Sequence, residues 1–134
     1  MIIGTGIDIV DISTFRHRLN EELVTELFLP DEAVYCRTQA RSWENFAARF
    51  AAKEAAFKAL GAGLEQGLRW HQVEVVRDPA GPVALRLHGL AAELATRLGV
   101  TACHLSLSHS SENAIAMVLM EAVAPDQPEP EASS

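Results

Sequence analysis

Residues 44–60, ENFAARFAAKEAAFKAL, form the segment that most strongly determines the fold of this chain. The segment is rich in alanine and contains neither glycine nor proline, which favours an α-helix. Gly61 follows at the position where a helix commonly ends, and Ser42 is a suitable N-cap before it. We therefore expect a long helix over residues 44–60 that serves as the core helix of the domain.

Apolar patterns on both sides of this helix predict strands. They lie at residues 2–12, 72–77, 83–87, 103–108 and 114–120. Gly4 and Gly6 interrupt the first of these and indicate a bulge or a close backbone approach near its start. A turn at residues 78–81, Asp-Pro-Ala-Gly, joins the second strand to the third.

Further helices are expected between the strands. One begins after Asp11 or Ser13 and reaches about residue 23, and another covers about residues 31–38. A third covers residues 89–98, with Leu90, Leu94 and Leu98 on one stripe and Gly99 at its end. The resulting order of strand, helices, hairpin, helix and hairpin predicts an α+β domain with a largely antiparallel sheet around the long helix.

The composition predicts one domain followed by a short tail. The chain has 134 residues, of which 49% are hydrophobic, so it can hold a core without disulfides or metals. Residues 124–134, APDQPEPEASS, contain three of the six prolines and no large apolar residue. We therefore expect a single domain over residues 1–123 and a disordered acidic, proline-rich tail over residues 124–134.

Charge, hydropathy and cysteine content exclude several classes of function. The formal net charge is −7, of which three charges belong to the tail, so nothing favours nucleic-acid binding. No apolar run approaches the roughly 20 residues that span a bilayer, and the N-terminus does not resemble a secretion signal. Cys36 and Cys103 form neither a CxxC motif nor a Cys/His cluster. We expect a protein of the cytoplasm that contacts no membrane.

A charged residue interrupts the first strand. Asp8 stands among isoleucines and a valine, where an ionised carboxylate is costly unless an opposite charge meets it. The alternative is an edge strand that leaves Asp8 in water.

Charged residues also interrupt the long helix. At 100° per residue, Lys53 lies inside the aromatic stripe and Glu54 lies on its edge. These two side chains either reach past the margin of the core to solvent or point into a functional site. The alternative for Glu54 is a pair with Lys58 on a solvated helix face, which would contribute only about 0.2–0.5 kcal/mol.

The segment LSLSHS, residues 105–110, is a strand with alternating serines that ends at His109. The sequence has no G-x-S-x-G motif, so a serine hydrolase is not supported. A histidine at a strand end is usually a surface or capping residue. His109 gains a function only as a donor to a phosphate, a task that suits histidine and serine hydroxyls.

Together, three segments resemble the holo-[acyl-carrier-protein] synthases, which are short 4′-phosphopantetheinyl transferases. The segments are G-x-G-I-D-I-V at residues 4–10, R-F-A-A-K-E-A-x-x-K-A-L-G-x-G at residues 49–63, and L-S-L-S-H-S at residues 105–110. Each motif has limited specificity, but their order and spacing match the family over residues 1–123. The tail lies outside the resemblance.

The resemblance implies transfer of the 4′-phosphopantetheine arm of coenzyme A to a serine of apo acyl carrier protein, for fatty-acid or polyketide biosynthesis. Adenosine 3′,5′-bisphosphate would be released. By position, Asp8 and Glu54 would hold Mg²⁺, and Lys58 and His109 would contact phosphates of coenzyme A. Asp8, Glu54 and Lys58 form the expected catalytic set. Glu54 is also a candidate to take the serine proton, either directly or through a water.

Other expectations from the resemblance are less direct. Lys53 would contact a phosphate or brace Glu54, and backbone amides at Gly61 and Gly63 would approach the nucleotide. Arg16 and Arg18 would dock an acidic helix of the carrier protein. Family members are typically trimers with active sites between subunits.

The charges near the expected docking residues depart from the family pattern. Glu21, Glu22 and Glu26 follow Arg16 and Arg18 closely, so the basic patch for an acidic carrier is thin. Opposite charge mainly raises the association rate and sets the register of binding, so a small patch can suffice.

Two other classes of function remain open from the sequence. The first is a module that binds coenzyme A or a related nucleotide without catalysis, although such binding does not require paired metal carboxylates. The second is an interaction domain without a small ligand, in which the charges of the core helix would be coincidental.

Overall fold

The computed structural model describes residues 1–77 and 81–124. Most of the turn predicted at residues 78–81 lies outside the described residues. The tail predicted at residues 124–134 does so from residue 125 onward, and the division into domain and tail stays a prediction.

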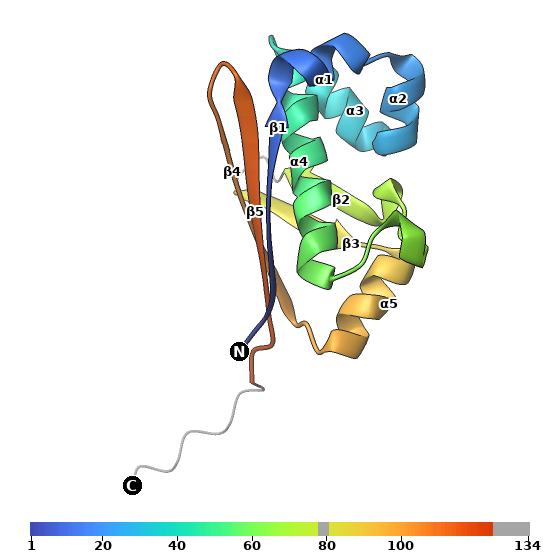
Figure 1. Ribbon diagram of the computed structural model, residues 1–134, viewed down its shortest axis with the longest axis vertical. Helices are drawn as coiled ribbons and strands as arrows, with labels where there is room; N and C mark the ends of the chain where they lie inside the picture. The colour runs from blue at the N-terminus through green and yellow to red at the C-terminus, as the bar shows by residue number, and fades with distance from the viewer. Residues whose placement is uncertain (78–80, 125–134) are drawn as a thin grey trace, which may run out of the picture.

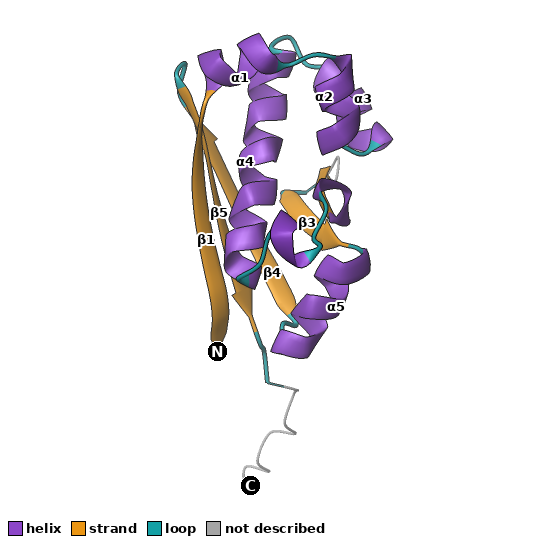
Figure 2. Cartoon of the chain, turned by 45° about the vertical axis from the view of Figure 1, so that its right-hand side comes forward, coloured by secondary structure: helices purple, strands orange, loops and turns teal. Residues whose placement is uncertain are grey.

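An antiparallel three-stranded sheet and one long helix form the centre of the fold (Figure 1). The strand order is β1 (Ile2–Asp11), β5 (Asn113–Glu121) and β4 (Ala102–His109). Helix α4 (Ser42–Leu60) covers one face of this sheet. The antiparallel hairpin of β2 (Val73–Arg77) and β3 (Val83–Leu87) lies on the other side of α4 (Figure 2).

Shorter helices gather at the two ends of α4. Figure 1 shows α1 (Ile12–Arg18), α2 (Glu21–Leu27) and α3 (Pro30–Arg37) beside its first half, and α5 (Gly89–Leu98) beyond its last turn. The 3₁₀ turns η1 (Leu64–Gln66) and η2 (Trp70–Gln72) connect α4 to β2. The predicted α+β class, with antiparallel pairing around a long core helix, is confirmed.

Small residues bring β1 unusually close to α4. A Cβ atom on Gly4 would lie 2.0 Å from the carbonyl oxygen of Ala59, and one on Gly6 would lie 1.8 Å from that of Ala55. The register shifts between Ile2 and Gly4. Both the bulge and the close approach predicted near the start of this strand are therefore confirmed.

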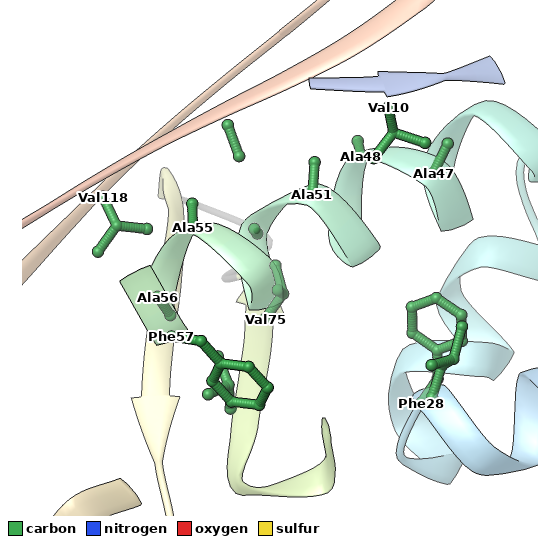
Figure 3. Close-up of a cluster of buried hydrophobic side chains, with 14 of the residues drawn as sticks. Val10, Phe28, Ala47, Ala48, Ala51, Ala55, Ala56, Phe57, Val75 and Val118 are labelled. Atoms are coloured by element: carbon green, nitrogen blue, oxygen red, sulfur yellow. The ribbon is translucent and has the colours of Figure 1, made fainter. Parts of the chain in front are cut away.

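The core lies on both faces of α4 (Figure 3). Ala51 and Ala55 face the sheet, where Val118 of β5 is fully buried. Phe57 lies on the other side of the helix, toward Val75 of β2. Because α4 is covered on both sides, most of its residues are buried, and these include the charged residues Arg49 and Lys53.

The helix predicted to reach residue 23 is two helices, α1 and α2. Asp11 caps α1 by accepting the N–H of Thr14 at 2.8 Å, and Asn20 caps α2 by accepting the N–H of Leu23 at 2.8 Å. The second cap begins a new helix where the pattern indicated a continuous one.

Two finer predictions for the helices are wrong. Ser42 is the first helical residue of α4, and the preceding Arg41 makes no side-chain cap. Of the stripe predicted in α5, Leu90 and Leu94 pack against the core beside the buried Ala91 and Ala95, whereas Leu98 is 40% exposed. Gly61 and Gly99 end their helices in the left-handed conformation, as predicted.

Candidate active site

Asp8, Glu54 and Lys58 lie together where β1 crosses α4. Asp8 lies on the inner face of β1, like Gly6 and Val10, and its side chain is only 11% exposed. Lys58 Nζ donates to Asp8 Oδ1 at 3.0 Å and to the carbonyl oxygen of Ile7 at 3.0 Å. β1 is an edge strand, but the Asp8 side chain does not lie in water, so that alternative is wrong for the side chain. Lys58 forms its ion pair with Asp8 of β1.

The pKa of the Glu54 carboxyl is raised from 4.5 to about 7. The largest cause is burial, which disfavours the charged form, followed by the hydrogen bond and negative charge of the neighbouring Asp8. The positive charge of Lys58 acts in the opposite direction. Asp8 therefore opposes the ionisation of Glu54, and a cation between the two carboxyl groups would relieve this opposition.

The residues present fit a hard divalent cation. Asp8 Oδ2 is buried and accepts no hydrogen bond from a donor group of the described residues. Carboxylate oxygens are the donors that Mg²⁺ prefers, and it is usually held by one or two carboxylates together with waters and substrate phosphates. No group of three or more His, Cys, Asp and Glu side chains suited to a metal occurs in residues 1–77 and 81–124. The site is therefore of the open, two-carboxylate kind.

A pocket of about 510 Å³ opens beside Glu54. Apolar side chains form most of its wall, including Phe50 and Trp70, whose ring centroids lie 5.1 Å apart. Arg18 and Glu26 are among its polar lining residues. The pocket offers an apolar space next to the carboxylates, lined by one basic residue, Arg18, and by two further acidic residues, Asp11 and Glu26.

Lys53 is not in the site, which corrects the prediction that it contacts a phosphate. Its side chain is 0% exposed and pairs with Glu32 at 2.8 Å, on the side of α4 that faces away from Asp8. Desolvation lowers the pKa of Lys53, whereas the charge of Glu32 raises it. Successive helix residues are separated by 100°, so Lys53 and Glu54 point into different layers.

The amides after α4 are already used, which corrects the prediction that they bind the nucleotide. The Gly61 N–H bonds to the carbonyl oxygen of Lys58, that of Ala62 to Phe57, and that of Gly63 to Gln66 Oε1 at 2.7 Å. The turn therefore closes the helix and leaves no free N–H group at these residues. A Cβ would meet nothing within 4 Å at Gly61 and only Gln66 at Gly63, so the surface there is open.

His109 lies at the other edge of the sheet, on β4, and is separated from Asp8 by strand β5. It lines a pocket of about 380 Å³ together with Arg49. Its Nδ1 atom is 3.8 Å from Glu44 Oε2. Within one chain, His109 and the Asp8–Glu54 pair occupy opposite edges.

The sequence reasoning assigned no role to Arg49. Its side chain lies over the Tyr35 ring at 4.4 Å, and the residue is only 3% exposed. In the described part of the chain it has no carboxylate within salt-bridge distance, and its Nε makes no hydrogen bond. The signal was available, because Arg49 lies on the same apolar helix as Lys53. A buried guanidinium without a counter-charge is suited to an anion.

Arg16 and Arg18 do not form one patch. The Arg16 guanidinium stacks 3.7 Å above the Trp43 ring and lines a different pocket, of about 450 Å³. Arg18 lines the 510 Å³ pocket beside Glu54, where Glu26 also lies. Residues two apart on a helix point in nearly opposite directions, which explains the separation.

None of the helices in residues 1–77 and 81–124 combines the length and apolar character needed to cross a bilayer.

Comparison with known proteins agrees with this geometry. Residues 4–118 match the model of the 4′-phosphopantetheinyl transferase superfamily. A holo-[acyl-carrier-protein] synthase of Geobacter sulfurreducens is 52% identical over 124 residues, which cover 90% of this chain and 98% of that protein. This chain belongs to the holo-[acyl-carrier-protein] synthases. The resemblance inferred from three motifs is thereby confirmed.

Solved structures of holo-[acyl-carrier-protein] synthases share the fold. The enzyme of Bacillus anthracis, in complex with coenzyme A (3′,5′-ADP), superposes with a TM-score of 0.76 and 31% identity. That comparison covers 92% of this chain and 99% of the other. The enzyme of Neisseria meningitidis gives a TM-score of 0.80 at 26% identity, covering 90% and 99% of the two chains.

Proposed function

We propose that this protein transfers the 4′-phosphopantetheine group of coenzyme A to a serine hydroxyl of apo acyl carrier protein. The new bond joins the serine oxygen to phosphorus, the phosphorus–oxygen bond to adenosine 3′,5′-bisphosphate breaks, and the serine proton passes to a base. The observation that carries the proposal is the half-buried Asp8–Glu54 pair with Lys58 beside it, in a chain of the holo-[acyl-carrier-protein] synthase family.

Each of the three residues has a defined task. Asp8 and Glu54 would hold Mg²⁺, which when bound neutralises negative charge on the pyrophosphate. Lys58 already bonds Asp8 and a carbonyl oxygen, so its ammonium is held in place as a positive charge for a phosphate oxygen. Glu54 is also the candidate to take the serine proton, directly or through a water.

The second phosphate contact would come from Arg49 and His109. Both line one pocket, and Arg49 lacks a counter-charge among the described residues. Because this pocket lies by β4 and the carboxylates lie by β1, a head-to-tail ring of subunits would bring the two edges together.

A homotrimer is the ring that we propose, with each active site between two subunits. The outer face of the sheet supports such an assembly, because it exposes the large apolar side chains of Ile7, Ile9, Ile115 and Met117. A contiguous apolar face of this kind is typical of an interaction surface.

The carrier protein would dock at the pocket beside Glu54. Arg18 there offers a positive charge and the apolar walls offer contact area, whereas Arg16 would act from the other side of α1. The carrier belongs to fatty-acid or polyketide synthesis, and we place the reaction in the cytoplasm.

A mass measurement tests the function. After incubation of the protein with Mg²⁺, coenzyme A and an apo carrier, we expect the carrier to gain about 340 Da, the mass of the phosphopantetheine group. Glu54→Gln should lower kcat by at least about 100-fold, because it removes a metal ligand and the candidate base. Glu93→Gln, the same change at an exposed position of α5, should keep the wild-type rate.

The opposite results would contradict the proposal. No mass gain on any fatty-acid or polyketide carrier, together with tight binding of coenzyme A in calorimetry, would make the protein a binding module. Wild-type turnover by Glu54→Gln would remove Glu54 from both of its roles.

A further inference from the structure

Lys53 and Glu32 form a fully satisfied buried network. The Lys53 ammonium donates to Glu32 Oε1 at 2.8 Å, to the carbonyl oxygen of Trp70 at 3.1 Å and to that of Val73. Glu32 Oε1 also accepts the Leu29 N–H at 2.9 Å, and its Oε2 accepts the Val75 N–H at 2.9 Å. All three ammonium hydrogens and both carboxylate oxygens therefore have partners.

The network joins four segments of the chain. Glu32 belongs to the first turn of α3, Lys53 to the middle of α4, Trp70 to η2, and Val73 and Val75 to β2. The side chains of Lys53 and Glu32 are 0% and 1% exposed. Burial of an ion pair carries a desolvation penalty, and such a pair often adds no net stability over an apolar pair of similar size. The contribution of Lys53 and Glu32 is therefore expected in the geometry that their hydrogen bonds impose.

The face of α4 toward the sheet contributes little to setting the rotation of the helix. It presents small side chains such as Ala51 and Ala55 (Figure 3), and Gly6 of β1 lies opposite Ala55. Contacts between such small side chains bring the two elements close together but have little interlocking shape. A rotation of about 20° would move side-chain ends about 2 Å, since the helix radius including side chains is about 5–6 Å.

We infer that the Lys53–Glu32 pair is a positioning pair, which sets the rotation of α4 so that the adjacent Glu54 faces Asp8. The hydrogen bonds of Lys53 are directional and fix α4 against η2 and β2, which the alanine face cannot do. The same bonds hold Trp70, a wall of the pocket beside Glu54. The inference rests on the proposed function, because it concerns the geometry of the proposed metal site.

Mn²⁺ serves as the probe, because its binding is measured by electron paramagnetic resonance without any turnover. The main variant is Glu32→Leu with Lys53→Met, which replaces both charges by apolar groups and leaves no charge unpaired. We expect a cooperative melt at a lower Tm, because the Leu29 and Val75 N–H groups lose their acceptor. We also expect Mn²⁺ affinity at least about tenfold weaker and kcat at least about 30-fold lower, since a displacement of about 1 Å can cost 10²-fold.

A control separates positioning from general loss of packing. Leu94→Ala removes partly buried side-chain volume from α5, away from the network. It should lower Tm while Mn²⁺ affinity stays within about twofold of wild type. An equal loss of affinity in Leu94→Ala would overturn the positioning role.

The other outcomes are equally decisive. Wild-type Mn²⁺ affinity and kcat in the folded double variant would overturn this inference while leaving the proposed function intact. If the wild type itself binds no Mn²⁺ and transfers nothing, the proposed site and this inference both fall. If the double variant does not fold, Glu32→Gln replaces it: affinity at least about threefold weaker supports the inference, and unchanged affinity overturns it.

Discussion

Glu54 should make the metal-free protein sensitive to pH. Its pKa is about 7 in the folded protein and near 4.5 otherwise, so the folded state binds more protons between these values. Stability therefore falls as pH rises through this range. Without divalent cations, we expect Tm to fall by about 4 °C from pH 5 to pH 8, equivalent to about 1 kcal/mol once the partial exposure of Glu54 is allowed for.

Calorimetry of the wild type and Glu54→Gln checks this prediction. The glutamine variant should lose the Glu54 contribution and show a flatter Tm between pH 5 and pH 8. Mg²⁺ should raise the wild-type Tm most at pH 8, because the Glu54 carboxyl, with a pKa of about 7, is mostly ionised there. Identical pH dependence of Tm for the two proteins would show that ionisation of Glu54 beside Asp8 does not lower stability.

At the scale of elements, the contact between β1 and α4 depends on glycine. A Cβ on Gly6 would lie 1.8 Å from the Ala55 carbonyl oxygen and 2.8 Å from its carbon, and both atoms are backbone. Gly6→Ala must therefore push the strand and helix apart. We expect a loss of about 2–4 kcal/mol of unfolding free energy, measured by denaturant titration.

Gly63→Ala is the matched control for this substitution. Gly63 has an extended backbone, and the nearest atom to its Cβ would be Gln66 Oε1 at 3.8 Å. Its unfolding free energy should stay within about 0.5 kcal/mol of wild type. Equal effects at both positions would show that the close approach at Gly6 is not responsible.

At the scale of the whole molecule, the two halves of the proposed site lie at different edges of the sheet. Arg49→Met and Glu54→Gln should each be nearly inactive, because each removes one half. When the two variants are co-expressed and assemble at random, about a quarter of all sites combine a native Glu54 with a neighbour's native Arg49. We expect transfer activity to recover toward that fraction.

Light scattering and the transfer assay test this arrangement together. Met117→Lys places a charge on the exposed apolar face of the sheet. This face is opposite the face that α4 covers. It should convert the proposed trimer to a monomer and abolish complementation. Recovery no greater than the sum of the single variants would show that each chain completes its own site.

Most elements and the central carboxylates could be predicted from the sequence. Helices and strands depend largely on residues that are close together in the chain. This applies to the alanine-rich pattern of residues 44–60, to Gly61 at its end and to the alternating patterns of the strands. Asp8 and Glu54 could be recognised because each breaks an apolar pattern. The break between α1 and α2 was missed because the Asn20 cap interrupts an otherwise helical pattern.

The sequence by itself determined which elements form and which residue types are available for chemistry. Only the tertiary structure decided which of these residues contact one another. Lys58 pairs with Asp8, 50 positions away in the sequence, and Lys53 pairs with Glu32, 21 positions away. The reason is geometric, because each helical step turns a side chain by 100° and only the packed layers define what lies in that direction. Lys53 and Glu54 are therefore neighbours in the chain and belong to different networks.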